Sequence, residues 1–433
     1  MAAARWVLWL VVAINVAIVE TVFLTAEPAK NQVLGLGTWL GLHLALVMIL
    51  QLVLIARLPW LDRRIGMDRL TSWHRWTGFT LFWLVLLHPT FVLLGYAREY
   101  DSTPLREFNN LRTQTPVLLG IFAAGIIVVA AAFSVRAARR RLSYEAWHTI
   151  HILLYVAIVF GLIHQLFEVS TFTSSPLAEV YWWGLWAVAL VSLLIGRVLT
   201  PLVRNARHQF RVAAVVPESD NVTSVYVTGK HLDRLPARAG QFMIWRFLGH
   251  GHWWDANPFS LSAAPDGHSL RLTAKAVGTA SARLRSVPVG TRVFAEGPYG
   301  AFTSLSRTRE ATLLIAGGVG ITPIRALLEE LTGPVTVLYR VSTEADAVLL
   351  GELQNLAKTK GARVHVLPGR TGAGNPPNTP FEPRNLESLV PDLRDRDVYV
   401  CGPAPMTNAV LRSLRALKVP PGQIHSERFS LAG

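Results

Sequence analysis

The chain of 433 residues contains a single cysteine, Cys401. One cysteine excludes a disulfide within the chain, and it excludes an iron–sulfur cluster held by cysteines alone. The sequence also has no internal repeat, no EF-hand loop and no extended regulatory segment. We therefore expect no 2Fe–2S centre, and activity that requires neither calcium nor a cytosolic activator.

Acidic residues are scarce as well, because 28 Asp and Glu stand against 42 Lys and Arg, a formal net charge of +14. Such an excess can indicate binding of nucleic acid. Here much of it is arginine placed next to apolar runs, where it suits anionic lipid. The sequence therefore predicts a membrane partner and no nucleic acid.

Charge is almost absent from long stretches of the first 205 residues. Six runs are long enough to cross the hydrocarbon core as helices: 6–24, 38–56, 73–95, 116–135, 146–167 and 181–200. The first run follows a single charge, Arg5, and no clean cleavage site comes after it. We interpret it as a retained helix rather than a signal peptide.

Arginine is concentrated in alternate loops: 57–75, 136–141 and the segment after the sixth run. The opposite loops mix their basic residues with Glu27, Glu99, Asp101 and Glu107. By the positive-inside rule, both termini and the second half of the chain are cytoplasmic. We therefore expect a multi-pass protein of the plasma (inner) membrane.

Four histidines lie inside these apolar runs at matched depths. His74 and His88 are 14 residues apart on the third predicted helix, and His151 and His164 are 13 apart on the fifth, which runs in the same direction. The inner pair His74–His151 and the outer pair His88–His164 suit axial ligation of two haem irons stacked across the bilayer. The alternative for each histidine is a packing residue or a proton relay.

One angle fits this hypothesis poorly. Thirteen residues of an ideal helix leave His151 and His164 about 140° apart around its axis. We therefore expect either a local distortion of the helix near Gly161 or two haems approaching it from different sides. His148 does not remove the mismatch, and His43 on the second helix is a candidate to contact a haem propionate or line an acceptor pocket.

Two histidine pairs on the third and fifth of six helices resemble the ferric reductase transmembrane domain shared by NADPH oxidases and ferric reductases. That family also has unequal histidine spacings on these helices. The resemblance implies two b-type haems, with His74, His88, His151 and His164 as the metal ligands.

Residues 208–305 alternate short strand patterns with Gly/Pro turns, which predicts a small antiparallel barrel. In NPFSLSAAP, residues 257–265, strand geometry can expose backbone groups and the hydroxyl of Ser260 to a flat heterocycle, although a turn followed by a strand has the same pattern. In KAVGTASARL, Gly278, Thr279 and Ser281 begin a helix whose free amides could bind phosphate. The alternative there is an ordinary helix cap.

Residues 306–433 have the pattern of a doubly wound α/β domain. The strand ATLLIAGG runs into GGVGITP, where Gly318 and Gly320 permit close approach to a ligand and Thr322 begins a helix. The turn is not the GxGxxG fingerprint, so alone it is a weak signal. The segment Cys401–Gly402–Pro403 follows a late strand, at the edge where ligands bind in such sheets.

The ordered set NPFSLS, GTAS, EGPYG, GGVGITP, CGPAPM and SERF resembles the ferredoxin–NADP reductase superfamily across residues 206–433. The resemblance implies bound FAD and NAD(P)H. It assigns the flavin ring to Asn257, Pro258, Phe259, Ser260 and Ser262, with Ser260 near the redox nitrogen; the FAD pyrophosphate to Gly278, Thr279 and Ser281; the nicotinamide nucleotide to Gly318, Gly320, Thr322, Cys401, Gly402 and Pro403; and the cover of the isoalloxazine face to Phe429.

Two positions depart from the pattern of this family, and a third bears on the choice of nucleotide. Asn257 stands where the eukaryotic oxidases commonly have histidine, and Phe429 lies four residues before the end rather than at it. Arg340 follows the second strand of the nucleotide domain, where a guanidinium could pair with a 2′-phosphate. We therefore expect NADPH rather than NADH, with a solvated surface arginine as the alternative.

Together these features predict three domains: a haem-binding membrane domain (1–205), an FAD domain (206–305) and an NAD(P) domain (306–433). A nicotinamide delivers two electrons as a hydride, haem iron takes one, and a flavin can do both. The predicted path therefore runs from NADPH through FAD, with Ser260, Cys401 and Phe429 at the reaction centre, and through two haems to an external acceptor.

The sequence favours oxygen as that acceptor, which would make the chain a superoxide-producing NADPH oxidase, with a ferric chelate as the alternative. Two other hypotheses remain open. The membrane half could be a haem-free anchor for a flavin reductase, or a haem-binding scaffold without turnover.

Overall fold

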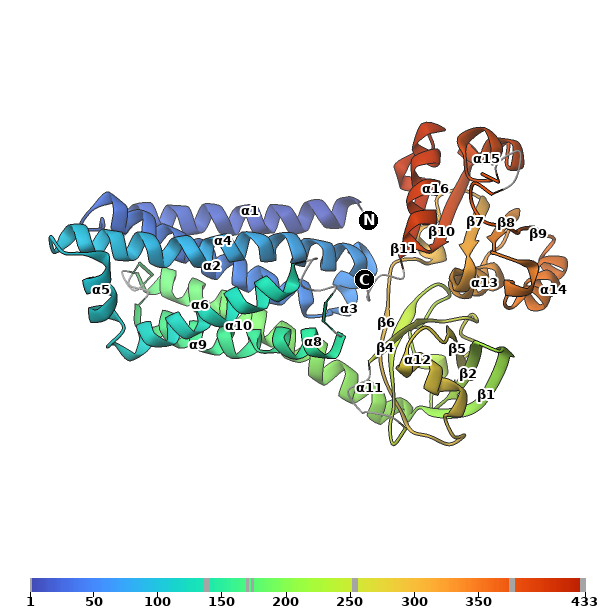
Figure 1. Cartoon of the computed structure of the whole chain (residues 1–433), viewed down its shortest axis with the longest axis horizontal. Coiled ribbons are helices and arrows are strands. Elements are labelled where there is room, and N and C mark those ends of the chain that lie inside the picture. The colour runs from blue at the N-terminus through green and yellow to red at the C-terminus, as the bar shows by residue number, and fades with distance from the viewer. Residues whose placement is uncertain are drawn as a thin grey trace. The chain divides into compact units, whose positions relative to one another are not determined.

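The computed structural model describes residues 2–135, 141–142, 144–168, 171–172, 175–250, 256–373 and 378–428. These residues form two compact units (Figure 1). The first contains residues up to Leu58 together with Arg69–Arg197, and the second contains Pro59–Asp68 together with the chain from Val198 onward.

The first unit is a bundle of long apolar helices that lie side by side (Figure 1). Six segments are long and apolar enough to span a membrane, as the sequence predicts: Ala4–Thr25, Gln32–Ile55, Arg69–Glu99, Thr115–Ser134, Ala146–Glu168 and Pro176–His208. The helices of this unit are α1 (Ala2–Thr25), α2 (Gln32–Ile55), α4 (Met67–Glu99), α5 (Pro104–Leu111), α6 (Thr115–Ser134), α8 (Tyr144–Ile152), α9 (Leu154–Glu168) and α10 (Pro176–Leu194), and α11 (Thr200–His208) follows in the second unit.

The fifth span is not one continuous helix. It is broken at Leu153, between α8 and α9, where the amide of Leu153 bonds to the carbonyl of Ile150 in a tighter turn. The break separates His151 from His164, so the angle calculated for an ideal helix does not apply. The expected distortion is therefore present, but it lies at Leu153 and not near Gly161.

Helices α2 and α4 approach each other closely at two glycines. A Cβ atom on Gly37 would lie 2.8 Å from the backbone nitrogen of Val92, and one on Gly95 would lie 2.6 Å from the Cα of Leu34. Small residues let helix backbones come together inside a membrane. This contact brings α4, with its two histidines, against the backbone of α2.

In the second unit, the chain after α11 first forms two antiparallel three-stranded sheets. Their strand orders are β1-β2-β5 and β4-β3-β6. The strands are β1 (Arg211–Ser219), β2 (Val222–Thr228), β3 (Phe242–Phe247), β4 (Asn257–Ser260), β5 (Ser269–Lys275) and β6 (Val293–Tyr299). Isolated bridges, Arg211 to Arg292 and Leu261 to Leu272, join the sheets on both sides of a core that includes the fully buried Trp245.

The same unit continues into a five-stranded parallel sheet of order β11-β10-β7-β8-β9. Its elements are β7 (Ala311–Gly317), α13 (Ile321–Glu330), β8 (Val335–Arg340), α14 (Leu350–Lys360), β9 (Arg363–Leu367), α15 (Pro383–Leu389), β10 (Arg396–Gly402), α16 (Ala404–Ala416) and β11 (Ile424–Arg428). One core packs α13 and α14 on one face, and a second packs α15 and α16 on the other. This is the predicted doubly wound arrangement.

Two segments that the sequence places with the membrane half pack instead on strand β6. Helix α3 (Pro59–Ile65) buries Leu61 and Ile65, and Met67 lies against the cluster of Phe242, Ile244 and Tyr299. Helix α11 uses the Asn205 side chain, which bonds to both the amide and the carbonyl of Ala295 at 2.8 Å. Position 205, the predicted domain boundary, therefore falls inside a helix of the second unit.

Candidate functional site

The planes of the two inner histidine rings are nearly perpendicular to each other in the first unit. The ring centroids of His74 on α4 and His151 on α8 are 6.1 Å apart, with ring planes at 80°. Two imidazoles that ligated one metal ion from opposite sides would have ring centroids about 6 Å apart. Both Nδ1 atoms are buried without a hydrogen-bond partner among the described residues, and Trp147 stacks on His151 at 5.0 Å.

The outer histidines are held by backbone carbonyls of neighbouring helices. Nδ1 of His88 lies 2.8 Å from the carbonyl oxygen of Gly37 on α2, and Nδ1 of His164 lies 3.1 Å from that of Pro116 on α6. A carbonyl only accepts, so each Nδ1 carries the proton and each Nε2 keeps the lone pair that a metal needs.

His74 and His151 therefore form a pair, while His88 and His164 share the bond from Nδ1 to a carbonyl. No group of three or more His, Cys, Asp or Glu side chains that could hold a metal ion occurs within the described ranges. Two neutral imidazoles at each of two depths are the donor set of six-coordinate haem iron. The unpartnered Nδ1 atoms and the 6.1 Å separation of the inner pair also fit this group.

His43 does not point toward the histidine pairs. Its Nε2 lies 3.3 Å from a carboxylate oxygen of Glu20 on α1, and its ring packs on Trp39 at 4.1 Å. Gly41, two residues earlier, is the residue of α2 that faces His88. Two residues turn a helix by about 200°, so His43 lies on the opposite side of α2.

The strand predicted to contact the flavin is β4, which pairs with β3 in the register Phe242–Ser260 and Trp245–Asn257. The hydroxyl of Ser260 is buried without a hydrogen-bond partner in the described structure. Ser262 differs, because it is fully buried and its hydroxyl accepts bonds from Arg271 (3.0 Å) and Thr273 (2.7 Å). Ser260 is therefore the hydroxyl of this segment that is left for a ligand.

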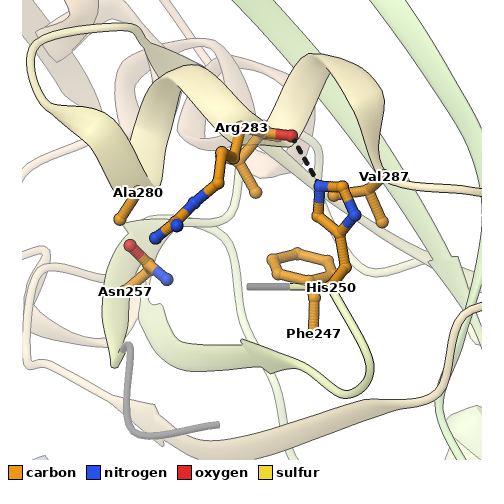
Figure 2. Close-up of a pocket in the computed structure, with 7 residues that line it drawn as sticks. Phe247, His250, Asn257, Ala280, Arg283 and Val287 are labelled. Carbon is orange, nitrogen blue, oxygen red and sulfur yellow. Dashed lines mark hydrogen bonds between the residues drawn. The ribbon is translucent and has the colours of Figure 1, made fainter. Parts of the chain in front are cut away.

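A pocket brings the flavin strand and the predicted phosphate segment together (Figure 2). Asn257 of β4 and Ala280 of α12 (Thr279–Arg283) line it. The remaining lining residues are Phe247, His250, Arg283, Leu284 and Val287, none of which the sequence singled out. The Arg283 side chain extends toward Asn257 (Figure 2), which places a positive charge where a cofactor phosphate would need one.

The hydroxyl of Ser281 has partners within the chain. Its Oγ lies 3.1 Å from the amides of Val277 and Gly278, and it donates to the Gly278 carbonyl at 3.0 Å. These bonds form a helix cap, the alternative weighed from the sequence. Gly278 and Thr279 are exposed, and a Cβ on Gly278 would meet nothing within 4 Å.

The glycine turn after β7 lies against the end of β10, as the sequence predicts. A Cβ on Gly320 would lie 2.3 Å from the carbonyl oxygen of Cys401, and one on Gly402 would lie 3.1 Å from the backbone of Gly317. The thiol of Cys401 is fully buried, which raises its pKa. Cys401 therefore offers its backbone, rather than a thiolate, to a ligand at this edge.

Two polar residues of the nucleotide domain donate hydrogen bonds to its backbone carbonyls. The Thr322 hydroxyl donates to the Val319 carbonyl at 3.0 Å. Arg340 is only 8% exposed, so it is not a solvated surface residue. Its Nη1 donates to the carbonyls of Leu367 and Pro368 and to Asn378, while Nη2 has no partner in the described part of the chain. Burial lowers the pKa of this guanidinium.

Charged side chains join the flavin-side strands to the nucleotide domain. Arg271 of β5 donates to the carbonyl of Ser262 (2.7 Å) and to Glu352 of α14 (2.8 Å), and Arg325 of α13 lies 3.0 Å from the same carboxylate. Burial alone would raise the pKa of Glu352, but the two arginines hold it below its usual value. The network fixes β4 and β5 against the helix that follows the glycine turn.

Phe429, the residue predicted to cover the flavin ring, lies outside the described residues. The ring centroid of His148 lies 6.4 Å from that of its neighbour Trp147.

Comparison with known proteins supports this division into two parts. The family model of the ferric reductase like transmembrane component matches residues 38–162, and that of the oxidoreductase NAD-binding domain matches residues 314–412. The first range contains all of His74, His88 and His151, and it ends two residues before His164.

Curated relatives resemble the second half of the chain. The ferredoxin reductase component of a Mycobacterium tuberculosis 3-ketosteroid-9-alpha-monooxygenase is 31% identical over 237 residues, which are 51% of this chain and 65% of that protein. A flavohemoprotein of Burkholderia sp. is 30% identical over 272 residues, 58% of this chain and 68% of that protein. The match to the first relative thus spans less than two thirds of its length.

Among solved structures, the FAD/NAD-binding domain of a nitric oxide dioxygenase from Vibrio cholerae is 26% identical. The match covers 51% of this chain and 98% of that chain, with a TM-score of 0.43.

Proposed function

The chain belongs to the oxidoreductases that join a ferric reductase-like transmembrane component to an FAD- and NAD(P)-binding reductase module, and we propose that it carries electrons from cytoplasmic NADPH across a membrane to an external acceptor. The observation that carries this proposal is the pairing of His74 with His151 in the membrane helices, together with His88 and His164 on the same two spans, each bonded through Nδ1 to a carbonyl so that Nε2 keeps its lone pair. A packing role or a proton relay would not require two such pairs.

The bound groups would supply the redox chemistry. FAD would take the two electrons of the hydride together and release them singly, and two b-type haems would carry single electrons between the two faces of the membrane. The chain itself would bind these groups, orient them and exclude water from them. Bis-histidine ligation leaves no open coordination position, so the acceptor would be reduced without binding to iron.

In the soluble unit each segment has a proposed task. The unpartnered hydroxyl of Ser260 would hydrogen-bond to the flavin ring, with Asn257, Pro258 and Phe259 beside it. Gly278, Thr279 and Arg283 would hold the pyrophosphate end. Gly318, Gly320, Gly402 and Pro403, with the backbone of Cys401, would hold the nicotinamide nucleotide, and Phe429 would cover the ring.

For the acceptor we propose oxygen, with superoxide as the product. Transfer of one electron to oxygen needs no proton-donating side chain and no metal site. A ferric chelate is the second candidate, because the matching family model is that of ferric reductases. The residues that the structure describes offer no cluster of three metal-binding side chains for ferric ion, which favours the first.

A haem count tests the proposal. The purified protein should show two b-type haems per chain by pyridine haemochrome assay, and NADPH should reduce them in the presence of FAD. His74→Leu or His151→Leu should remove one haem, and His88→Leu or His164→Leu the other. His43→Gln, which alters a histidine on the far side of α2, is the matched control and should keep both.

Absence of haem, with flavin reductase activity intact, would refute the proposal and leave the membrane half as an anchor. Haem that NADPH does not reduce would mean a scaffold without turnover. The acceptor is tested separately by superoxide dismutase-sensitive reduction of cytochrome c in air, against anaerobic reduction of a ferric chelate. A faster anaerobic reaction with the chelate would replace oxygen by ferric iron.

A further inference from the structure

The two outer histidines are seated on neighbouring helices in the same way. His88 bonds to the carbonyl of Gly37, and four residues later α2 has Gly41. His164 bonds to the carbonyl of Pro116, and four residues later α6 has Gly120. Two separate helices therefore present a carbonyl at position i and a glycine at position i+4 to an imidazole ring.

Helix geometry explains the spacing. A side chain on a helix leans toward the N-terminus, so the side chain at i+4 lies beside the carbonyl of residue i. Hydroxyl side chains in these membrane helices show this directly, since Thr90 donates to the carbonyl of Leu86 and Ser134 to that of Ala130. A side chain at position i+4 would therefore block the approach of a histidine on a neighbouring helix to the carbonyl of residue i.

The space left by the two glycines is filled by the histidine rings. A Cβ on Gly41 would lie 2.7 Å from Cε1 and 2.8 Å from Nδ1 of His88. A Cβ on Gly120 would lie 3.0 Å from both Cγ and Nδ1 of His164. The contacts of the Cβ on Gly41 are shorter than real Cβ atoms make. The contacts of the Cβ on Gly120 are tight enough that the His164 ring would have to move. Alanine at position 41 would force the His88 ring away from its carbonyl, and alanine at position 120 would press the His164 ring away by a few tenths of an ångström.

The inner pair lacks this arrangement of a carbonyl and a glycine among the described residues. No described glycine has the ring of His74 or His151 among its nearest neighbours, and both inner Nδ1 atoms are without a partner in the described structure. The outer rings are thus fixed in orientation and tautomer by the chain itself. A hydrogen bond from Nδ1 to a carbonyl also makes Nε2 a more basic ligand.

We propose that Gly41 and Gly120 are positioning residues for the outer haem: they make room for His88 and His164 to reach the carbonyls of Gly37 and Pro116, which fixes Nε2 as the ligand. This inference rests on the proposed function, because it requires that the outer pair hold a haem. Ligation by the outer histidines would then depend on these glycines and carbonyls, whereas ligation by the inner histidines would not.

The experiment compares Gly41→Ala and Gly120→Ala with two control variants in the same helices. A Cβ on Gly125 of α6 would meet nothing within 4 Å, and one on Gly35 of α2 would make only an ordinary contact at 3.6 Å. Gly125→Ala and Gly35→Ala should therefore keep two haems per chain. The readouts are haem per chain, the low-spin ferric EPR signals and a potentiometric titration of the purified protein.

In Gly41→Ala and Gly120→Ala we expect the haem count to fall from two to about one. The EPR spectrum of the remaining haem should match that of His164→Leu, and NADPH should still reduce it. Two haems with unchanged EPR signals and midpoint potentials would overturn the proposal. Loss of both haems, or retention of the outer one alone, would overturn it as well, since the glycine would then support the bundle as a whole. A wild-type protein without haem would instead refute the proposed function.

Discussion

Oδ2 of Asp62 accepts a hydrogen bond of 2.7 Å from the backbone amide of Gly300, 238 residues away in sequence. Asp62 is only 1% exposed and belongs to α3, the short helix that connects two membrane helices. Gly300 ends the EGPYG segment with a φ of 101°, a conformation that favours glycine. The connection between the second and third membrane helices is therefore built into the flavin-side sheet.

Asp62→Ala should destabilise the second unit. The substitution removes a bond between a carboxylate and an amide and leaves the buried Gly300 amide without that partner, which costs about 1.5–3 kcal/mol of unfolding free energy. The measurement is the temperature at which bound FAD is released, followed by its fluorescence. Arg64→Ala, an exposed position on the same helix, should change this temperature little. Equal release temperatures for both variants would show that α3 is not part of the folded unit.

Ser260→Ala separates a ligand-binding role from a structural one. The Ser260 hydroxyl is buried without a protein partner, so its removal should leave the stability of the FAD-free protein unchanged or slightly higher. If the hydroxyl bonds to the flavin, reduction of ferricyanide by NADPH should fall about tenfold or more, corresponding to about 1.4 kcal/mol or more. Ser269→Ala, on β5, is the control. An active Ser260→Ala enzyme would contradict the assigned role.

Arg340→Gln tests the choice between NADPH and NADH. Nη1 of Arg340 is bonded within the chain, and Nη2 is the group left to meet a 2′-phosphate. Loss of one charged contact to phosphate should raise the KM for NADPH about tenfold, or about 1.4 kcal/mol, and leave that for NADH unchanged. Steady-state kinetics with both nucleotides give the answer. An equal rise for both would show that Arg340 only stabilises the loop around Pro368.

Elements with strong periodic or apolar signals were predictable from the sequence. The six spans, the proximity of His74 to His151 and the doubly wound sheet all follow from run length, residue spacing and strand–turn–helix order. These features depend on local composition, which a single sequence records well. The proximity of Gly320 to Cys401 also follows, because the carboxyl ends of parallel strands meet at one edge.

Features that depend on distant contacts were not predictable. The break at Leu153 has no glycine or proline to mark it. Helix α3 lies in a segment that the sequence shows only as an arginine-rich loop. Its sequence does not reveal that Leu61, Asp62 and Ile65 are buried against the second unit. The depth of His43 follows from its position in the second run, but the side of α2 on which it lies does not, because its partner Glu20 lies on another helix. The buried state of Arg340 likewise depends on carbonyls 27 and 28 residues away.

The buried pair His425–Asp397 should make the stability of the second unit depend on pH. Nε2 of His425 lies 3.0 Å from Oδ1 of Asp397, and its ring stacks on Tyr399 at 4.4 Å. Burial lowers the pKa of His425 below its usual 6.5, although Asp397 opposes this shift. Well above pH 6.5 the histidine is neutral in both the folded and the unfolded chain, so it adds no pH dependence there.

As the pH falls below 6.5, the unfolded chain takes up a proton that the folded chain resists, and stability is lost by at most about 1.4 kcal/mol per pH unit. The temperature of FAD release should therefore drop between pH 7.5 and pH 5.5. In His425→Asn this drop should shrink, because the group that titrates is gone, whereas His268→Asn at an exposed position should keep it. A drop of the same size in His425→Asn would mean that other groups control the acid response.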